Sequence, residues 1–234
     1  MVRVKVCCIS SVEEACLAVR LGASALGLVS GMPSGPGVIS EAQIAEIAAT
    51  VPPPVGTFLL TSRTDPAEIT AQQQRCRTTT VQICDRLPTG ALAKLRKSLP
   101  GISLEQVIHV TAEASVEEAL AAAREVDALL LDSGNQALPV KELGGTGRTH
   151  DWSLSARIVE KSGVPVFLAG GLNADNVSEA IRLIQPFGLD LCTGVRTDGV
   201  LDESKLRKFM TAVEATTQQG APADTKTATR FRRG

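Results

Sequence analysis

The stretch PVFLAGGLNADNVSEAIRLIQPFGLDLC, residues 165–192, contains one complete unit of the pattern on which the fold depends. Its first apolar run, 165–169, has the length of a buried strand. Residues 173–184 then carry apolar side chains at helical spacing, and a second apolar run covers 188–192. A strand, a helix and a strand in this order predict a βαβ unit with parallel strands.

The same alternation continues through the rest of the chain. Further strands are expected at 2–8, 25–30, 55–60, 79–83, 104–110 and 128–132, and helices at 12–21, 40–49, 65–75, 89–98, 115–125, 152–162 and 203–213. Eight strand–helix units in about 215 residues predict a single α/β domain, a (β/α)8 or TIM barrel with an eight-stranded parallel core. A doubly wound open sheet is the alternative, although such sheets usually have fewer strands.

The helical pattern stops after Val213. We therefore assign residues 1–216 to the barrel and residues 217–234 to a polar, disordered C-terminal tail. The tail ends in RFRRG, which predicts either a solvated segment or a weak contact with an anionic surface.

Composition argues against several classes of protein. Lys and Arg number 24 against 25 Asp and Glu, so the basic surplus of a nucleic-acid binder is missing. No apolar run approaches the ~20 residues needed to span a bilayer. The start, MVRVKVCC, does not resemble a signal peptide. We expect a cytoplasmic protein without nucleic-acid or membrane partners, either a monomer or a homodimer.

The six cysteines form no CxxC pair, so we expect reduced thiols and no metal site.

The active site of such a barrel lies at the carboxyl ends of its strands, and the loops after strands 7 and 8 usually hold phosphate. Adjacent glycines allow backbone N–H groups to approach an anion closely, and the next helix would present its N-terminus there. These features predict a site for a phosphorylated small molecule at Gly170, Gly171, Asn173, Thr193 and Gly194. The glycine-rich loop after strand 6 borders the same end but has no P-loop spacing. We expect Gly145 of this loop to contact the substrate.

Strand parity places a second group of residues inside the barrel. In strand 1, Lys5 and Cys7 alternate with valines and should point inward, whereas Cys8 should face the helices. A buried lysine needs a partner, and Asp190 of strand 8 is the candidate. We also expect Lys5 to contact the substrate. Asp132 ends strand 6, where a carboxylate can act as an acid or base. The alternatives are a buried apolar role for Cys7 and a loop cap for Asp132.

Several motifs at these positions resemble the phosphoribosylanthranilate isomerase family of tryptophan biosynthesis. KVCCIS at 5–10 resembles the family segment KICGIT, and LLDS at 130–133 resembles LLD[ST]. GGTGRTHDW at 144–152 is similar to GG[ST]G[KR]TFDW, and AGGLNADNV at 169–177 is similar to [AS]GGLNPENV. The resemblance covers strands 1 to 8 and is most specific in the second half.

The resemblance implies an Amadori rearrangement that needs no metal or organic cofactor. It makes Cys7 the general base and Asp132 the general acid. It also places the substrate phosphate on the backbone N–H groups of Gly171, Cys192, Thr193 and Gly194.

The chain departs from the family around the anthranilate end of the substrate. The loop after strand 2 has glycine where the family has an arginine, and SSGVE becomes CTGVR at 192–196. We therefore expect Arg196 to grip a substrate carboxylate from the opposite side, with a solvated loop residue as the alternative. Two other functions stay open, a related isomerase of another phosphorylated sugar and a non-catalytic barrel that binds a phosphorylated metabolite.

Overall fold

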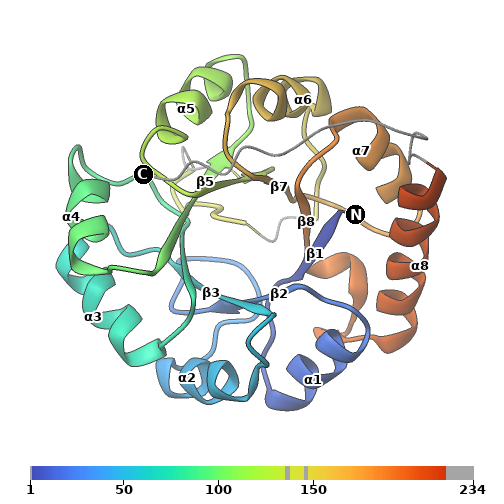
Figure 1. The fold of residues 1–234 in the computed structure, drawn as a ribbon, viewed down its shortest axis with the longest axis horizontal. Helices are drawn as coiled ribbons and strands as arrows, with labels where there is room; N and C mark the ends of the chain where they lie inside the picture. Colours follow the sequence, from blue (N-terminus) through green and yellow to red (C-terminus); the bar gives the residue numbers. More distant parts are fainter. Residues whose placement is uncertain (1, 135–137, 145–146, 220–234) are drawn as a thin grey trace.

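The computed structural model describes residues 2–134, 138–144 and 147–219. The expected barrel is confirmed, because eight parallel strands pair in chain order and β1 closes the ring on β8 (Figure 1). The open-sheet alternative is wrong. The strands are β1 Arg3–Val6, β2 Ala25–Val29, β3 Gly56–Thr61, β4 Thr80–Ile83, β5 Ser103–His109, β6 Ala128–Asp132, β7 Val166–Leu168 and β8 Gly188–Leu191.

In the part of the chain that the structure describes, eight helices surround the ring (Figure 1). They are α1 Val12–Arg20, α2 Glu41–Thr50, α3 Pro66–Cys76, α4 Ala91–Ser98, α5 Ala114–Ala122, α6 Trp152–Lys161, α7 Val177–Ile184 and α8 Glu203–Gln219. A 3-10 turn, η1 Thr193–Val195, and a small ribbon, β9 Arg196–Thr197 with β10 Val200–Leu201, link β8 to α8. Among the described residues, every helix is too short or too polar to cross a bilayer.

Alternate strand residues fill two separate regions, as the pleat of a strand requires. Val4 and Val6 belong to the large core between the strands and the helices. Phe58 and Phe167 lie inside the barrel, where their rings meet edge to face with centroids 6.1 Å apart. The barrel interior is therefore packed at this level by side chains.

A buried ion pair joins β1 to β8 inside the barrel. The two strands set Lys5 directly beside Asp190, and Nζ lies 2.9 Å from Oδ2. The Lys5 ammonium also donates to Oε1 of Gln82 at 2.8 Å. Burial opposes the charge on Lys5, but Asp190, Cys7 and Glu105 outweigh it and raise its pKa above the ordinary value. The expected partnership of Lys5 with Asp190 is confirmed.

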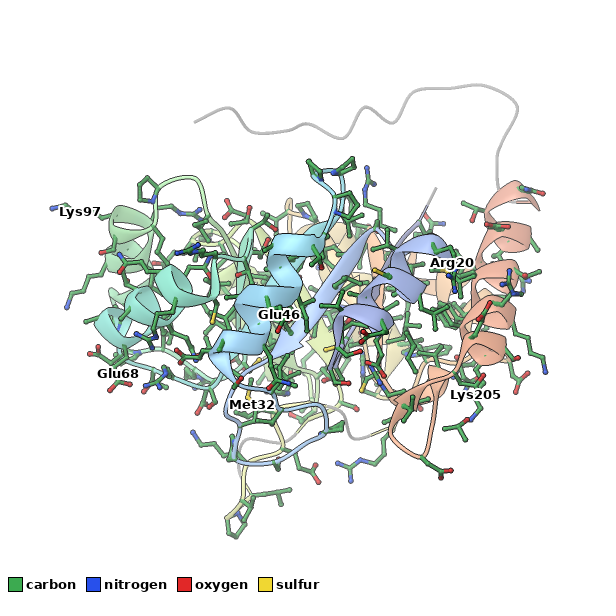
Figure 2. All side chains as sticks on the ribbon, turned by 90° about the horizontal axis from the view of Figure 1, so that it is seen from below. Arg20, Met32, Glu46, Glu68, Lys97 and Lys205 are labelled. Atoms are coloured by element: carbon green, nitrogen blue, oxygen red, sulfur yellow. The ribbon has the colours of Figure 1, made fainter. Side chains whose placement is uncertain are left out.

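The loops that follow the strands gather at one end of the molecule. Figure 2 shows Met32, Glu68 and Lys205, which follow β2, β3 and β8, at that end. Arg20 and Lys97, in the last turns of α1 and α4, lie toward the opposite end.

Most element boundaries differ from the sequence prediction by a few residues, and the end of α8 differs most. α8 continues six residues beyond Val213, because Thr216 stays on its buried face and its hydroxyl donates to Oγ of Ser178 at 2.7 Å. α5 begins at Ala114 and ends at Ala122, whereas the sequence predicted a helix over 115–125. The Ser115 hydroxyl accepts from the backbone of Thr111 at 3.1 Å. Most of the expected tail, 220–234, lies outside the described residues.

A second buried ion pair fastens α1 to the ribbon after β8. The Arg196 guanidinium donates to Oε1 of Glu14 at 2.9 Å and to the carbonyls of Cys7 and Cys8 at 3.1 and 2.6 Å. Glu14 in turn accepts from the backbone of Leu201 at 2.8 Å. Burial raises the pKa of Glu14, but the hydrogen bonds from Arg196 and from the backbone outweigh burial and lower it. This cluster holds the end of β1 against the end of β8.

We predict that Arg196→Ala lowers the free energy of unfolding by about 3 kcal/mol, because it leaves a buried carboxylate without its cation. Urea unfolding measures the loss. Arg207→Ala is the control, since its pair with Glu203 is exposed and should contribute no more than about 0.5 kcal/mol. Because the pKa of Glu14 is lowered on folding, its contribution is present at neutral pH and is lost as pH falls through the folded value. Equal losses in the two variants would contradict this account.

Candidate active site

One cavity opens at the carboxyl ends of the strands. Its empty space, with the open solvent at its mouth included, is about 700 Å³. Its walls come from the ends of β1, β2, β3, β4, β6, β7 and β8 and the loops behind them. The lining includes Cys7, Val29, Leu60, Gln82, Asp132, Ala169 and Cys192.

Cys7 follows β1 and points into this cavity, as strand parity predicted. Its backbone N–H donates to the carbonyl of Leu191 at 2.8 Å, so the residue is held against β8. Lys5 lies two residues earlier on the same side of the strand, beneath the cavity, and is fully buried. Lys5 is absent from the cavity wall, so the structure places it under the site and out of contact with a substrate, contrary to the expectation that it binds one.

Asp132 ends β6 and lines the same cavity. Its Oδ1 accepts from the backbone N–H of Ser133 at 2.7 Å, which fixes the carboxylate. Its Oδ2 lies toward Gly144, where an added Cβ would come within 2.9 Å of that oxygen. The glycine therefore allows the loop after β6 to pass close to the carboxylate. Around the ring, β6 is separated from β1 by only β7 and β8.

The turn after β7 depends on two glycines with left-handed backbones. Gly170 has φ +85° and Gly171 has φ +62°. A Cβ on Gly171 would lie 2.9–3.0 Å from backbone atoms of 147–149, so the loop after β6 packs directly on this turn. Only glycine meets both conditions without strain.

Asn173 caps a turn rather than the helix itself. Its Oδ1 accepts from the backbone N–H groups of Asp175 and Asn176 at 2.9 and 3.2 Å, and α7 begins at Val177. The helix therefore begins four residues later than the sequence predicted. Asn173 lies behind the cavity wall, whereas Gly170 and Gly171 form part of it.

The segment after β8 packs on the same turn. A Cβ on Gly194 would collide with the carbonyl of Leu172, so glycine is required there as well. Cys192 and Thr193 line the cavity beside Gly171. The structure thus brings the loops after β7 and β8 together, as the sequence predicted for a phosphate site. Gly145, the other glycine assigned to substrate binding, lies outside the described residues.

Arg196 does not reach the cavity. Its side chain is 6% exposed and is committed to Glu14 and to the carbonyls at the end of β1. This contradicts both expectations for it, a grip on a substrate carboxylate and a solvated loop position. Among the residues described, the cavity lining contains no lysine or arginine.

The expectation that Cys8 faces the helices is also wrong. β1 ends at Val6, so the alternation of a strand no longer applies, and Cys8 has φ +61°. This left-handed conformation turns its side chain into the cavity. Its Sγ lies 2.8 Å from Sγ of Cys192 and 3.9 Å from Sγ of Cys7. The signal was present in the sequence, because the family segment KICGIT has glycine at this position.

Sequence reasoning missed Gln82 and the apolar walls. Gln82 of β4 lines the cavity and holds the Lys5 ammonium from the side opposite Asp190. Met32 and Leu143, from the loops after β2 and β6, line the mouth. The parity of β4 could have placed Gln82 inside the barrel. Nothing in the sequence showed that the two loops meet.

Comparison with known proteins agrees with this geometry. A family model described as N-(5'phosphoribosyl)anthranilate (PRA) isomerase matches residues 4–212. N-(5'-phosphoribosyl)anthranilate isomerase 2 of Methanosarcina mazei is 35% identical over 210 residues, which cover 89% of this chain and 92% of that one. The Nostoc punctiforme isomerase is 33% identical over 209 residues, 88% of this chain and 96% of its own.

Solved structures agree on the fold. Phosphoribosyl anthranilate isomerase from Thermotoga maritima superposes with a TM-score of 0.79 at 28% identity, covering 92% of this chain and all of that one. A further isomerase, in complex with reduced 1-(o-carboxyphenylamino)-1-deoxyribulose 5-phosphate, has a TM-score of 0.76 at 27% identity, with coverage of 92% and 100%. The chain therefore belongs to the N-(5'-phosphoribosyl)anthranilate isomerase family.

Proposed function

We propose that this chain converts N-(5-phosphoribosyl)anthranilate to the corresponding 1-deoxyribulose 5-phosphate by an Amadori rearrangement, with Cys7 as general base and Asp132 as general acid. The observation that carries the proposal is that Cys7, Asp132 and the glycine turn after β7 line one cavity. The related isomerase of solved structure described above is in complex with a reduced form of such a phosphorylated product. The proposal places this chain's activity in tryptophan biosynthesis.

The proposed reaction needs two proton transfers on the substrate. Asp132 protonates the ring oxygen of the aminoaldose, and the sugar opens to a Schiff base. Cys7 then removes the proton from C2′, and the resulting enolamine relaxes to the ketone. In general acid–base catalysis of this kind, both groups must reach the same substrate molecule. Cys7 and Asp132 meet this condition because they line the same cavity.

The charge on Lys5 supports the role of Cys7. Lys5 stays protonated at neutral pH because neighbouring anionic groups, Asp190 first among them, outweigh the effect of burial on its pKa. A fixed positive charge beneath Cys7 attracts the negative charge that a cysteine base carries. Lys5 thus acts as a positioning residue within this proposal.

The substrate phosphate would sit at the turn after β7. We assign it to the backbone N–H groups of Gly171, Cys192, Thr193 and Gly194, beside Gly170. A left-handed glycine pair exposes such groups to an anion without a cationic side chain. Asn173 supports this site by holding the turn that precedes α7.

A second candidate, an isomerase of another phosphorylated sugar, rests on one observation. Within the described residues, no cationic side chain lines the cavity to receive the carboxylate of anthranilate. Complementation of a tryptophan auxotroph that lacks this isomerase, with assay of the purified protein on phosphoribosylanthranilate, separates the two candidates. Growth and turnover support the first, whereas a folded protein that does neither supports the second.

We predict that Cys7→Ser lowers kcat by ~10²–10⁴, the range for a lost acid or base. Steady-state assay with phosphoribosylanthranilate measures it. Cys16→Ser is the control, because Cys16 is exposed on α1 and should leave kcat unchanged. A Cys7→Ser enzyme within about twofold of the parent would exclude Cys7 as the base.

Asp132→Asn should lower kcat over the same ~10²–10⁴ range, because the amide cannot donate the proton that ring opening requires. The isosteric change keeps the acceptor for the N–H of Ser133. Thermal unfolding should therefore match the parent. Retained turnover would assign the general acid to another group.

We predict that Thr193→Asp weakens the binding of phosphate esters by about tenfold or more, since it sets a like charge beside the anion. Thr193 is exposed in the cavity wall, so the protein should fold normally. Substitution of Gly171 is unsuitable, because any Cβ there meets backbone. Thr193→Asn is the neutral control in a calorimetric titration with a phosphosugar. Similar affinities in the two variants would move the phosphate site elsewhere.

A further inference from the structure

We propose that Cys8 and Cys192 form a redox switch at the phosphate end of the cavity, which a hydroperoxide closes as a disulfide and a thiol reductant reopens. The covalent step depends only on the two thiols. Its effect on turnover rests on the function proposed above.

The two thiols are already aligned. Cys8 follows β1 and Cys192 follows β8, which are neighbouring strands with Val6 beside Leu191. The two Sγ atoms lie 2.8 Å apart, against about 2.05 Å in a disulfide bond. Both side chains line the cavity, where a small oxidant can reach them.

The surroundings assign different roles to the two sulfurs. The hydrogen bond between Cys192 and Cys8 and the positive charge of Arg196 lower the pKa of Cys192 despite its burial. The thiolate is the form that attacks a peroxide. The pKa of Cys8 is raised, first by its hydrogen bond with Cys192, so Cys8 is the sulfur that keeps its proton while Cys192 is the thiolate. Oxidation of Cys192 removes that thiolate, and Cys8 then loses its proton and attacks as the resolving sulfur.

The chemistry balances in two steps. The Cys192 thiolate attacks the hydroperoxide, whose O–O bond breaks, and leaves a sulfenic acid and an alcohol, or water when the oxidant is hydrogen peroxide. The Cys8 sulfur then attacks the sulfenic sulfur, the S–S bond forms, and water leaves with the Cys8 proton. In total, two thiols lose two electrons and two protons to one hydroperoxide.

Cys7 is a poor alternative partner for Cys8. Consecutive Cα atoms are about 3.80 Å apart, below the 4.4–6.8 Å that disulfides usually span. The Sγ atoms of Cys7 and Cys8 are also farther apart, at 3.9 Å. The geometry therefore favours the bond between Cys8 and Cys192, which leaves the Cys7 thiol unmodified.

The new bond would change the phosphate end of the cavity. Cys192 immediately precedes η1, and its own N–H belongs to the proposed phosphate site. The disulfide bond draws the Cys192 side chain toward β1 and so misaligns the backbone N–H groups of the proposed phosphate site. We therefore expect the oxidised protein to bind phosphate esters about tenfold more weakly, the cost of losing a hydrogen bond to a charged group.

The test treats the reduced full-length chain with increasing hydrogen peroxide, blocks the remaining thiols with maleimide and maps the peptides by mass spectrometry. A phosphosugar titration and the isomerase assay follow at each dose, before and after dithiothreitol. Cys8→Gly removes the resolving thiol, and glycine suits the φ of +61° at this position. Cys16→Ser, which removes an exposed thiol far from the pair, is the control. Each variant is compared with its own unoxidised state.

We expect two of the six thiols to disappear in the parent and two of the five in Cys16→Ser. Both proteins should give a cross-linked peptide pair containing residues 8 and 192, and reductant should restore their binding. Cys8→Gly should form no such pair and should keep its activity at doses that inactivate the parent. Equal inactivation of Cys8→Gly, or a cross-link that leaves phosphosugar affinity unchanged, would overturn the switch. If the reduced parent shows no isomerase turnover, the proposed function is rejected but the redox switch is not. The cross-link map and the phosphosugar titration would still test the switch.

Discussion

The buried pair of Lys5 and Asp190 is the constraint on which the rest of the site depends. It joins the first strand to the last, so it lies at the seam where the barrel closes. A buried ion pair adds little to stability compared with apolar packing, but a one-residue slip of β1 would leave both charges without partners. Gln82 of β4 holds the same ammonium from across the barrel. The pair therefore specifies the register that brings Cys7 to the cavity.

Glu105 is a second buried carboxylate near Lys5, but it lacks the direct ion-pair contact that Asp190 makes. It is fully buried on β5, and burial raises its pKa to about 7 although the charge of Lys5 opposes the shift. Burial raises the pKa of Asp190 as well, and direct contact with the Lys5 ammonium opposes that shift. Two carboxylates thus compete for one cation. The nearer carboxylate stabilises the charge of Lys5 directly beneath the cavity.

The two buried ion pairs, one formed by Lys5 and one by Arg196, hold the end of β1 from different sides. Lys5 acts from within the barrel, whereas Arg196 acts from outside and binds the carbonyls of Cys7 and Cys8. Between them, the short segment that carries both cysteines is held from two sides. This arrangement explains how a non-glycine residue persists at φ +61°, a conformation that is costly for a side chain unless its surroundings hold it. It also accounts for the cysteine in place of the family's glycine.

The sequence by itself determined the barrel, since eight repeats of one pattern leave few other closed arrangements. It also determined the inward parity of Cys7 and Lys5, the partner of Lys5 and the glycine turn after β7, because these depend on local periodicity and backbone sterics. Only the tertiary structure decided the positions of Cys8 and Arg196. Cys8 lies beyond the last residue of its strand, where alternation no longer governs direction. Arg196 binds Glu14, a residue 182 positions earlier in the chain, and therefore does not reach the cavity. A local sequence pattern cannot predict a contact over that separation.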